Sequence, residues 1–329
     1  MAIRVLDSQP LSLGIDIGGT KAHGVVLDAG DRVLAEAELP TEPTEVGIRR
    51  TVLAVSDALA GELGVRPSRF TTVGLGIPGV VDPAAGVVET AVNLRIARTD
   101  LAALLADAFA AKVRVENDVK ATALGAGLAL GTARDLAYVN IGTGVAAAAV
   151  SRGRLIRGAR NGAGEIGHFV VDPSGEACPC GQRGCLETVL GGGHLAKRLL
   201  SLGLGLDALG TDPAPAARAE KDRLVAALAT ALNLVAIVYD SAVIVIGGGV
   251  PQRAGWLRPA VVADLRRRAE ESPFLAGLAV ADRVVELPPR SPWPRSTRRP
   301  RAARWTFSSR STSKSQARRR PGPSSTGSR

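Results

Sequence analysis

Residues 15–20 read Ile-Asp-Ile-Gly-Gly-Thr, and residues 139–144 repeat the pattern as Val-Asn-Ile-Gly-Thr-Gly. Each stretch is a glycine turn between two apolar segments with the character of strands. The flanking segments are Leu11–Ile17 and Gly24–Leu27 for the first turn, and Leu136–Ile141 and Val145–Val150 for the second. Two strand–turn–strand units of this kind predict a protein with two halves built alike.

Strand and helix patterns alternate around these units, which predicts an α/β fold. The further strands that we expect are Val33–Glu38, Val73–Ile77, Val113–Val115, Ala242–Ile246 and Val280–Leu287. The expected helices are Glu45–Leu63, Leu101–Ala111, Asp118 to about Leu130, Gly193–Leu202, Glu220–Tyr239 and Trp256–Glu271.

The charge of the chain is concentrated at its end. The net charge of +10 invites a nucleic-acid interpretation, but residues 290–329 hold twelve Lys or Arg and no acid. Subtracting these twelve from 41 leaves 29 basic against 31 acidic residues before position 290. We therefore expect a basic, disordered tail over 289–329 and no specific nucleic-acid partner.

The remaining sequence favours a cytoplasmic protein that does not enter a membrane. The first residues lack the long apolar region of a signal peptide. Val225–Val238 is the longest candidate for a membrane span, but it is short and contains Thr230 and Asn233.

The glycine turns are candidate phosphate sites. Gly18 and Gly19 let the backbone approach an anion closely, Thr20 and Lys21 add donors, and Asp16 could organise a magnesium hydration shell. A tight hairpin that needs glycine would look the same. The second turn, Gly142-Thr143-Gly144, strengthens the functional interpretation, because two facing hairpins can clamp a triphosphate. No P-loop string occurs, and Gly74–Gly79 is only a weak match to a dinucleotide fingerprint.

All three cysteines of the chain, Cys178, Cys180 and Cys185, lie close together, and His168 precedes the first of them by ten residues. Three thiolates and one imidazole complete a tetrahedral zinc site without an open position, which predicts structural zinc. Free buried thiols are the alternative. A disulfide is disfavoured by the odd count of cysteines.

Three carboxylates are candidates for work on a substrate. Asp118 follows a predicted strand and opens a helix, where an N-cap is the common role. We favour a general base that takes a proton from an alcohol attacking phosphorus, a role that capping does not exclude. Glu165 and Glu187 flank the predicted metal loop. Such carboxylates either accept hydrogen bonds from neighbouring sugar hydroxyls or are ordinary surface acids. His168 could present its second ring nitrogen to a ligand.

Taken together, these motifs resemble the ROK family of sugar kinases, related open reading frames and sugar-responsive repressors. They are Asp16–Lys21, Gly76–Gly79, Glu116–Asp118, Gly142–Gly144, Gly164–His168 and Cys178–Glu187. The resemblance implies the actin-like, ribonuclease H-type duplicated fold, with two domains and an interdomain cleft. The corresponding divisions are 1–117 and 118–288.

The resemblance also assigns residues. Asp118 matches the catalytic base, and the sugar-contacting positions fall on Gly79, Asn93, Asn117, Glu165, His168 and Glu187. The phosphate loops fall on Gly18–Lys21 and Gly142–Gly144, the turn near adenosine on Gly247, Gly248 and Gly249, and the zinc ligands on His168, Cys178, Cys180 and Cys185. The family further implies ATP, Mg²⁺ and structural Zn²⁺ as cofactors, a hexose as partner and a homodimer.

The leading hypothesis is a glucokinase that phosphorylates the 6-hydroxyl of glucose. Kinases of N-acetylmannosamine, N-acetylglucosamine, fructose or allose share the motifs, and polyphosphate is the alternative donor. A sugar-responsive regulator and a non-catalytic relative are the rival classes; about ten residues before Leu11 are too few for a helix-turn-helix domain.

Two departures from the family stand out. Asn93-Leu94-Arg95 replaces the usual Asn-Leu-Pro, which bears on the choice of sugar. The tail replaces a closing Gly/Ala-rich helix, and the abrupt change leads to the hypothesis of an altered reading frame at the 3′ end of the gene.

Overall fold

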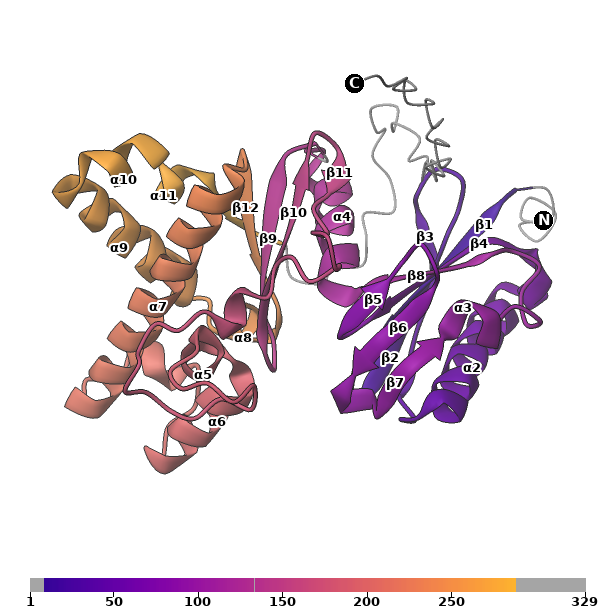
Figure 1. The fold of residues 1–329 in the computed structure, drawn as a ribbon, viewed down its shortest axis with the longest axis horizontal. Coiled ribbons are helices and arrows are strands. Elements are labelled where there is room, and N and C mark those ends of the chain that lie inside the picture. The colour runs from indigo at the N-terminus through magenta and orange to yellow at the C-terminus, as the bar shows by residue number, and fades with distance from the viewer. Residues whose placement is uncertain (1–8, 133, 288–329) are drawn as a thin grey trace, which may run out of the picture. The chain divides into compact units, whose positions relative to one another are not determined.

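The computed structural model describes residues 9–132 and 134–287, in which two five-stranded sheets carry most of the strands (Figure 1). The first sheet contains β1 Leu11–Ile17, β2 Lys21–Leu27, β3 Val33–Pro40, β4 Phe70–Ile77 and β8 Val113–Asn117. The second contains β9 Leu136–Ile141, β10 Val145–Ser151, β11 Arg154–Leu155, β12 Val243–Gly247 and β13 Val284–Glu286.

The two sheets have the same design. Their strand orders are β3-β2-β1-β4-β8 and β11-β10-β9-β12-β13. In each sheet the first three strands pair antiparallel and the last two join in parallel. Each glycine turn connects the central strand of its sheet to the antiparallel neighbour, so the predicted duplication is confirmed.

A third, antiparallel sheet was not anticipated from the sequence. It consists of β5 Val80–Asp82, β6 Val87–Ala91 and β7 Ile96–Asp100 in that order. These strands have three to five residues, which is too short for a period-two pattern to stand out. The sheet holds Asn93 beside the first glycine turn, since a Cβ on Gly19 would lie 3.6 Å from Asn93 Cβ.

Helices occur at all six expected places, and the described residues also contain four short helices that were not expected. The helices are α2 Glu45–Leu63, α3 Leu101–Leu104, α4 Asp118–Leu130, α5 Leu186–Leu190, α6 Gly192–Ser201, α7 Pro215–Tyr239, α8 Gly249–Arg253, α9 Leu257–Glu271, α10 Pro273–Leu278 and α11 Val280–Arg283. Short 3₁₀ turns occur at η1 Pro67–Arg69, η2 Val92–Leu94, η3 Ile166–His168 and η4 Ala208–Gly210.

Two of the predicted elements are much longer than the observed ones. The helix expected over Leu101–Ala111 ends at Leu104, because the chain tightens into turns with bonds from Ala106 N to Ala103 O and from Ala108 N to Leu105 O. The strand expected over Val280–Leu287 begins as α11 and becomes extended only at Val284. Asp282 and Arg283 interrupt the apolar run at that point.

The hydrophobic core falls into separate clusters. One runs from Leu11 to Val115 and surrounds Phe70, which has no exposed surface. Another joins the second sheet to α5, α7 and α9. A smaller cluster packs Val119 and Ala123 of α4 against the second sheet.

The domain limits drawn at 117, 118 and 288 stay predictions, and the expected tail lies outside the described residues.

Within the described residues, α7 is one helix that is long and apolar enough to cross a bilayer. Its packing is that of a core helix, because ten of its residues are buried and nine of these, all except Glu220, join the cluster around the second sheet. Length and apolar composition therefore reflect burial against the sheet here, and they carry little weight as evidence for a membrane.

Candidate functional site

The first glycine turn is a tight connection between β1 and β2. Gly18 N donates to Lys21 O at 2.9 Å, and Thr41 N donates to Thr20 O at 3.0 Å. The Lys21 ammonium lies 2.8 Å from Glu38 Oε2, and both side chains are exposed. These bonds fix the shape of the turn, and Glu38 orients its lysine.

Asp16 and Asp118 are brought together across Gly76 of β4. The pairing register sets Asp16 opposite Gly76, and Gly76 opposite Glu116 at the end of β8. A Cβ built on Gly76 would lie 3.4 Å from Asp16 Oδ1 and 3.5 Å from Asp118 Cα. The parallel pairing of β1, β4 and β8 therefore delivers the turn and the predicted base to the same edge of the sheet.

Asp118 is not the N-cap of α4. That role belongs to Asn117, whose Oδ1 accepts a hydrogen bond from Lys120 N at 3.0 Å. Asp118 occupies the first helical turn, where Val119 N donates to its Oδ1 at 2.8 Å. Since capping is done by Asn117, the structural alternative considered for Asp118 does not hold.

The surroundings of Asp118 disfavour its charged form. Burial raises the pKa of Asp118 to about 6, and the negative charges of Asp16 and Glu165 act in the same direction. The hydrogen bond from Val119 N opposes them by stabilising the carboxylate. A carboxyl group with this pKa is ionised near neutral pH and still basic enough to accept a proton.

Asn117 also links α4 to the loop before β5. Its Nδ2 donates to Gly79 O at 3.1 Å. Gly79 has a φ of 99°, and a Cβ there would lie 1.9 Å from Thr90 O. Only glycine fits this position, so Gly79 fixes the approach of the third sheet to Asn117.

We expect Gly79→Ala to lower the free energy of unfolding by about 1–3 kcal/mol, because alanine is strained at this φ and collides with the Thr90 carbonyl. Urea unfolding measures this change. Gly74→Ala is the matched control, since nothing lies within 4 Å of its Cβ and its φ is not positive. Equal unfolding midpoints for the two variants would contradict the prediction.

The second glycine turn is braced from the start of α6. Gly192 N donates to Gly142 O at 2.8 Å, and Gly193 N donates to Thr143 O at 3.2 Å. Glu187 Oε2 accepts from Val145 N at 2.9 Å and lies against Gly144. The predicted sugar-binding Glu187 is therefore fastened to the second turn through one of its carboxylate oxygens.

The predicted adenosine turn lies beside the same strand end. Gly248 has a φ of 101°, and a Cβ there would lie 2.5 Å from Ile141 O, the residue that precedes the second turn. A Cβ on Gly247 would meet the Tyr138 hydroxyl at 2.4 Å. The structure thus brings Gly247–Gly249 next to Gly142–Gly144, as the proposed nucleotide role requires.

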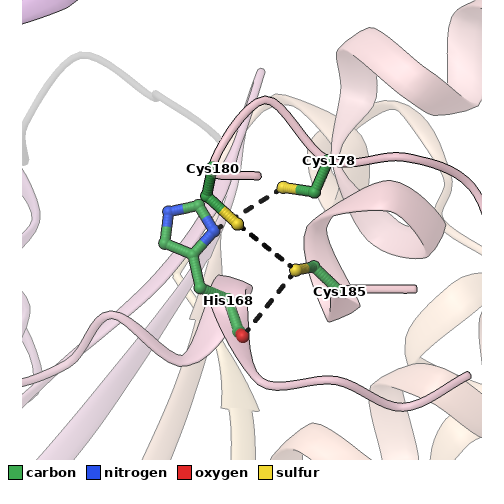
Figure 2. A group of neighbouring side chains, drawn as sticks. All are labelled: His168, Cys178, Cys180 and Cys185. Atoms are coloured by element: carbon green, nitrogen blue, oxygen red, sulfur yellow. Dashed lines mark hydrogen bonds between the residues drawn. The ribbon is translucent and has the colours of Figure 1, made fainter. Parts of the chain in front are cut away.

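The four predicted metal ligands form one cluster. His168, Cys178, Cys180 and Cys185 each offer a ligand atom, and these atoms lie within 4.8 Å of one another (Figure 2). Cys178 Sγ lies 3.8 Å from His168 Nδ1, and Cys180 Sγ lies 3.6 Å from Cys185 Sγ. Three sulfurs and one imidazole nitrogen at these separations fit a tetrahedral zinc ion.

The thiols of the cluster differ in their ionisation. Hydrogen bonds from the backbone and side chain of Gln182 lower the pKa of Cys180 to about 6. Burial, together with the neighbouring sulfurs, raises the pKa of Cys185 to about 12. Such opposed tendencies leave the cluster without a uniform charge state, and a bound cation would stabilise all three thiolates.

Lys120 is a residue that the sequence analysis did not single out. Its side chain is buried, with 3% exposure, and its Nζ donates to Asn161 O at 3.0 Å. Burial lowers the pKa of Lys120, and the charges of Glu116, Glu165 and Asp118 oppose this effect. A lysine two positions after Asp118 on an otherwise apolar helix was the available signal.

Two surface concavities of about 410 and 320 Å³ lie away from these residues. The first is lined by Ala85, Phe109 and Lys112 among others, and the second by Thr211, Arg218 and Lys221 among others. No predicted site residue lines either of them. The candidate site is therefore defined by the two glycine turns and the side chains that lie near them, and not by either of these concavities.

The duplicated sheets, each with a glycine turn after its central strand, define an actin-like ATPase fold. The ROK family profile matches residues 12–279, and the chain belongs to this family. Its members include both sugar kinases and regulators, as the named relatives below illustrate.

Three curated relatives show this range. The chain is 33% identical to a glucokinase of Halalkalibacterium halodurans over 56% of its own length and 58% of that protein. It is 32% identical to an N-acetylmannosamine kinase of Citrobacter koseri over 75% and 86% of the two chains. It is 28% identical to the DNA-binding transcriptional dual regulator NagC of Escherichia coli over 58% and 48%. The match thus spans about half the length of the glucokinase and of NagC.

Among solved structures, the chain resembles a ROK family glucokinase from Streptomyces griseus in complex with glucose and AMPPNP. The TM-score is 0.66 at 28% identity, and the match covers 78% of this chain and 89% of that one.

Proposed function

We propose that this protein is an ATP-dependent sugar kinase that converts glucose to glucose 6-phosphate, with Asp118 as general base. The observation that carries the proposal is the placement of Asp118 beside Asp16 of the first glycine turn, within the electrostatic reach of Glu165. A base, a phosphate-binding turn and a sugar-binding carboxylate are the three parts that transfer of a phosphoryl group to an alcohol needs.

In this proposal the Asp118 carboxylate accepts the proton of the 6-hydroxyl as that oxygen bonds to the γ-phosphorus of ATP. The bond between the γ-phosphorus and the β–γ bridging oxygen breaks, and ADP leaves. A pKa of about 6 leaves most of the Asp118 population ionised at pH 7. The loose transition state of phosphoryl transfer lets the proton move late, so a stronger base is not needed.

The other residues would bind and orient the two substrates. We assign the sugar to Gly79, Asn93, Asn117, Glu165, His168 and Glu187, and the nucleotide to Asp16, Gly18–Lys21, Gly142–Gly144 and Gly247–Gly249. Asp16 would hold Mg²⁺ through its water shell, and that ion would neutralise the phosphate charge. His168, Cys178, Cys180 and Cys185 would hold Zn²⁺ in a structural role.

A panel of hexoses with Mg-ATP, followed by coupled detection of ADP, tests the proposal. We expect glucose to give the highest kcat/KM, by about tenfold or more over N-acetylmannosamine, N-acetylglucosamine, fructose and allose. Polyphosphate in place of ATP should support little turnover. A higher kcat/KM for an N-acetylhexosamine would overturn the choice of substrate while leaving the reaction class intact.

The rival function is that of a sugar-responsive regulator, which binds a sugar without phosphorylating it. Saturable binding of glucose by calorimetry, with no ADP formed from any hexose in the panel, would assign the chain to the regulatory members of the family.

We further propose that the protein is a cytoplasmic homodimer. Light scattering of the purified chain would measure the assembly directly.

A further inference from the structure

The segment that carries Glu165 is held to the second sheet at both ends. Ile156 N donates to Ala149 O at 2.8 Å, and Ala147 N donates to Gly164 O at 2.7 Å. Between these points the Arg157–Glu165 loop leaves the sheet. Its own bonds are few and include Ala163 N to Arg157 O at 3.0 Å. The shape of this loop therefore depends on what it contacts elsewhere.

One outside contact is an ion pair with the end of β8. Arg157 donates from Nε and Nη2 to Glu116 Oε2, at 2.9 and 2.6 Å. The side chains are 28% and 13% exposed, so water screens this pair less than it screens a surface pair. Glu116 Oε1 also accepts from Asn117 N at 3.0 Å, which ties the pair to the N-cap of α4.

The other outside contact is Lys120. Its ammonium group donates to the carbonyl of Asn161 in the middle of the loop, at 3.0 Å. Asn161 has a φ of 59°, in the left-handed region that few residues other than glycine adopt. Burying a lysine is costly unless its charge is compensated, and here the nearby acids Glu116, Glu165 and Asp118 favour the charged form.

We propose that Lys120 and the Glu116–Arg157 pair form a two-point latch that holds the Arg157–Glu165 loop on the N-terminal end of α4 and positions Glu165 relative to Asp118. The latch rests on the proposed function for its role in sugar binding. The three residues are positioning residues, because they bond to other groups of the protein itself. Glu116 and Lys120 lie two positions before and two positions after Asp118. Their bonds to the loop therefore fix the position of the loop relative to the predicted base.

The latch makes a direct prediction for the mobility of the loop. In Arg157→Gln and in Lys120→Met, amide hydrogen exchange over residues 157–165 should become about tenfold faster, while α2 exchanges as in the wild type. Arg157→Lys keeps a charge opposite Glu116 and should recover part of the protection. Arg267→Gln removes the ion pairs of an exposed arginine with Asp264 and Glu271 on α9 and serves as the matched control; it should change nothing at the loop.

Kinetics separate positioning from a general loss of structure. The KM for the sugar should rise about tenfold in Arg157→Gln and Lys120→Met, whereas the KM for ATP should stay within about twofold, because the latch does not touch the glycine turns. Unchanged exchange at the loop in both variants would overturn the proposal. So would faster exchange that extends equally to α2, or equal changes in both KM values.

The proposed kinase activity and the latch can fail separately. If the wild type turns over no hexose, the kinase assignment fails, and the exchange experiment still decides whether the latch exists. Calorimetric binding of glucose then replaces the KM as readout. A loss of glucose affinity of about tenfold in the same two variants supports the latch, and unaltered affinity overturns it.

Discussion

Asp118→Asn is expected to lower kcat for hexose phosphorylation by about 10²–10⁴-fold, the usual contribution of a positioned general base. The amide has nearly the shape of the carboxyl group but cannot accept the proton. Coupled ADP detection measures the loss. Asp282→Asn, at an exposed and distant acid, is the control that should keep full activity.

The same substitution should make the protein more stable at neutral pH. The pKa of Asp118 is about 6 in the folded protein and near 3.8 in the unfolded chain. The folded state therefore binds the proton more tightly, and the charged group costs stability once the pH exceeds both values. This difference corresponds to about 3 kcal/mol above pH 7, which asparagine removes. The gain should shrink as the pH falls from about 6 toward 4 and vanish below about pH 3, where aspartate is protonated in both states.

The pH dependence of the wild type follows from the same pKa. The ionised base is required, so kcat/KM should fall as the pH drops through about 6 and level off above pH 7. Activity retained by Asp118→Asn within about tenfold of the wild type would remove Asp118 from the role of base. A variant that loses activity and also unfolds earlier would point to a structural role instead.

Removal of a ligand from the Cys/His cluster should have the second largest effect. Cys185 is fully buried in the cluster, and Cys185→Ser replaces a thiolate by a poor zinc ligand. We expect the purified wild type to carry one equivalent of zinc and the variant to lose it. The apparent Tm should fall by about 5 °C or more, because a structural metal site contributes directly to folding free energy.

Elemental analysis and thermal unfolding check both expectations. Arg183→Ala is the matched control, since this exposed side chain lies in the same loop and is not a member of the cluster. Zinc should remain in that variant. A wild type without zinc, or full zinc content in Cys185→Ser, would rule out the metal assignment.

The duplicated fold was predictable from the sequence because the two glycine turns sit in matching positions between strands of ordinary length. The Cys/His cluster was predictable because spacing alone restricts four ligands to one short loop. Strands of three to five residues, as in the third sheet, carry too little pattern. The latch was also beyond reach, because Glu116, Lys120 and Arg157 come together only after β8, α4 and the loop beyond β11 have been placed.

Capping at α4 shows a finer limit. Asn117 and Asp118 are both good N-cap residues, and the sequence does not separate their roles. The structure does, because β8 ends at Asn117 and leaves that residue extended, while Asp118 already has helical neighbours. The position at which β8 ends therefore decides which side chain caps the helix and which is available to a substrate.

The bond between Glu187 and Val145 N has a consequence for how the protein could respond to zinc. Cys185 is the residue just before α5, and Glu187, two residues later, accepts a hydrogen bond from Val145 N just after the second glycine turn. Only the short segment from Cys185 to Glu187 separates the Cys/His cluster from this contact with the second turn. Loss of the proposed zinc ion should therefore disturb the proposed nucleotide site, so that zinc depletion weakens affinity for the nucleotide as well as for the sugar.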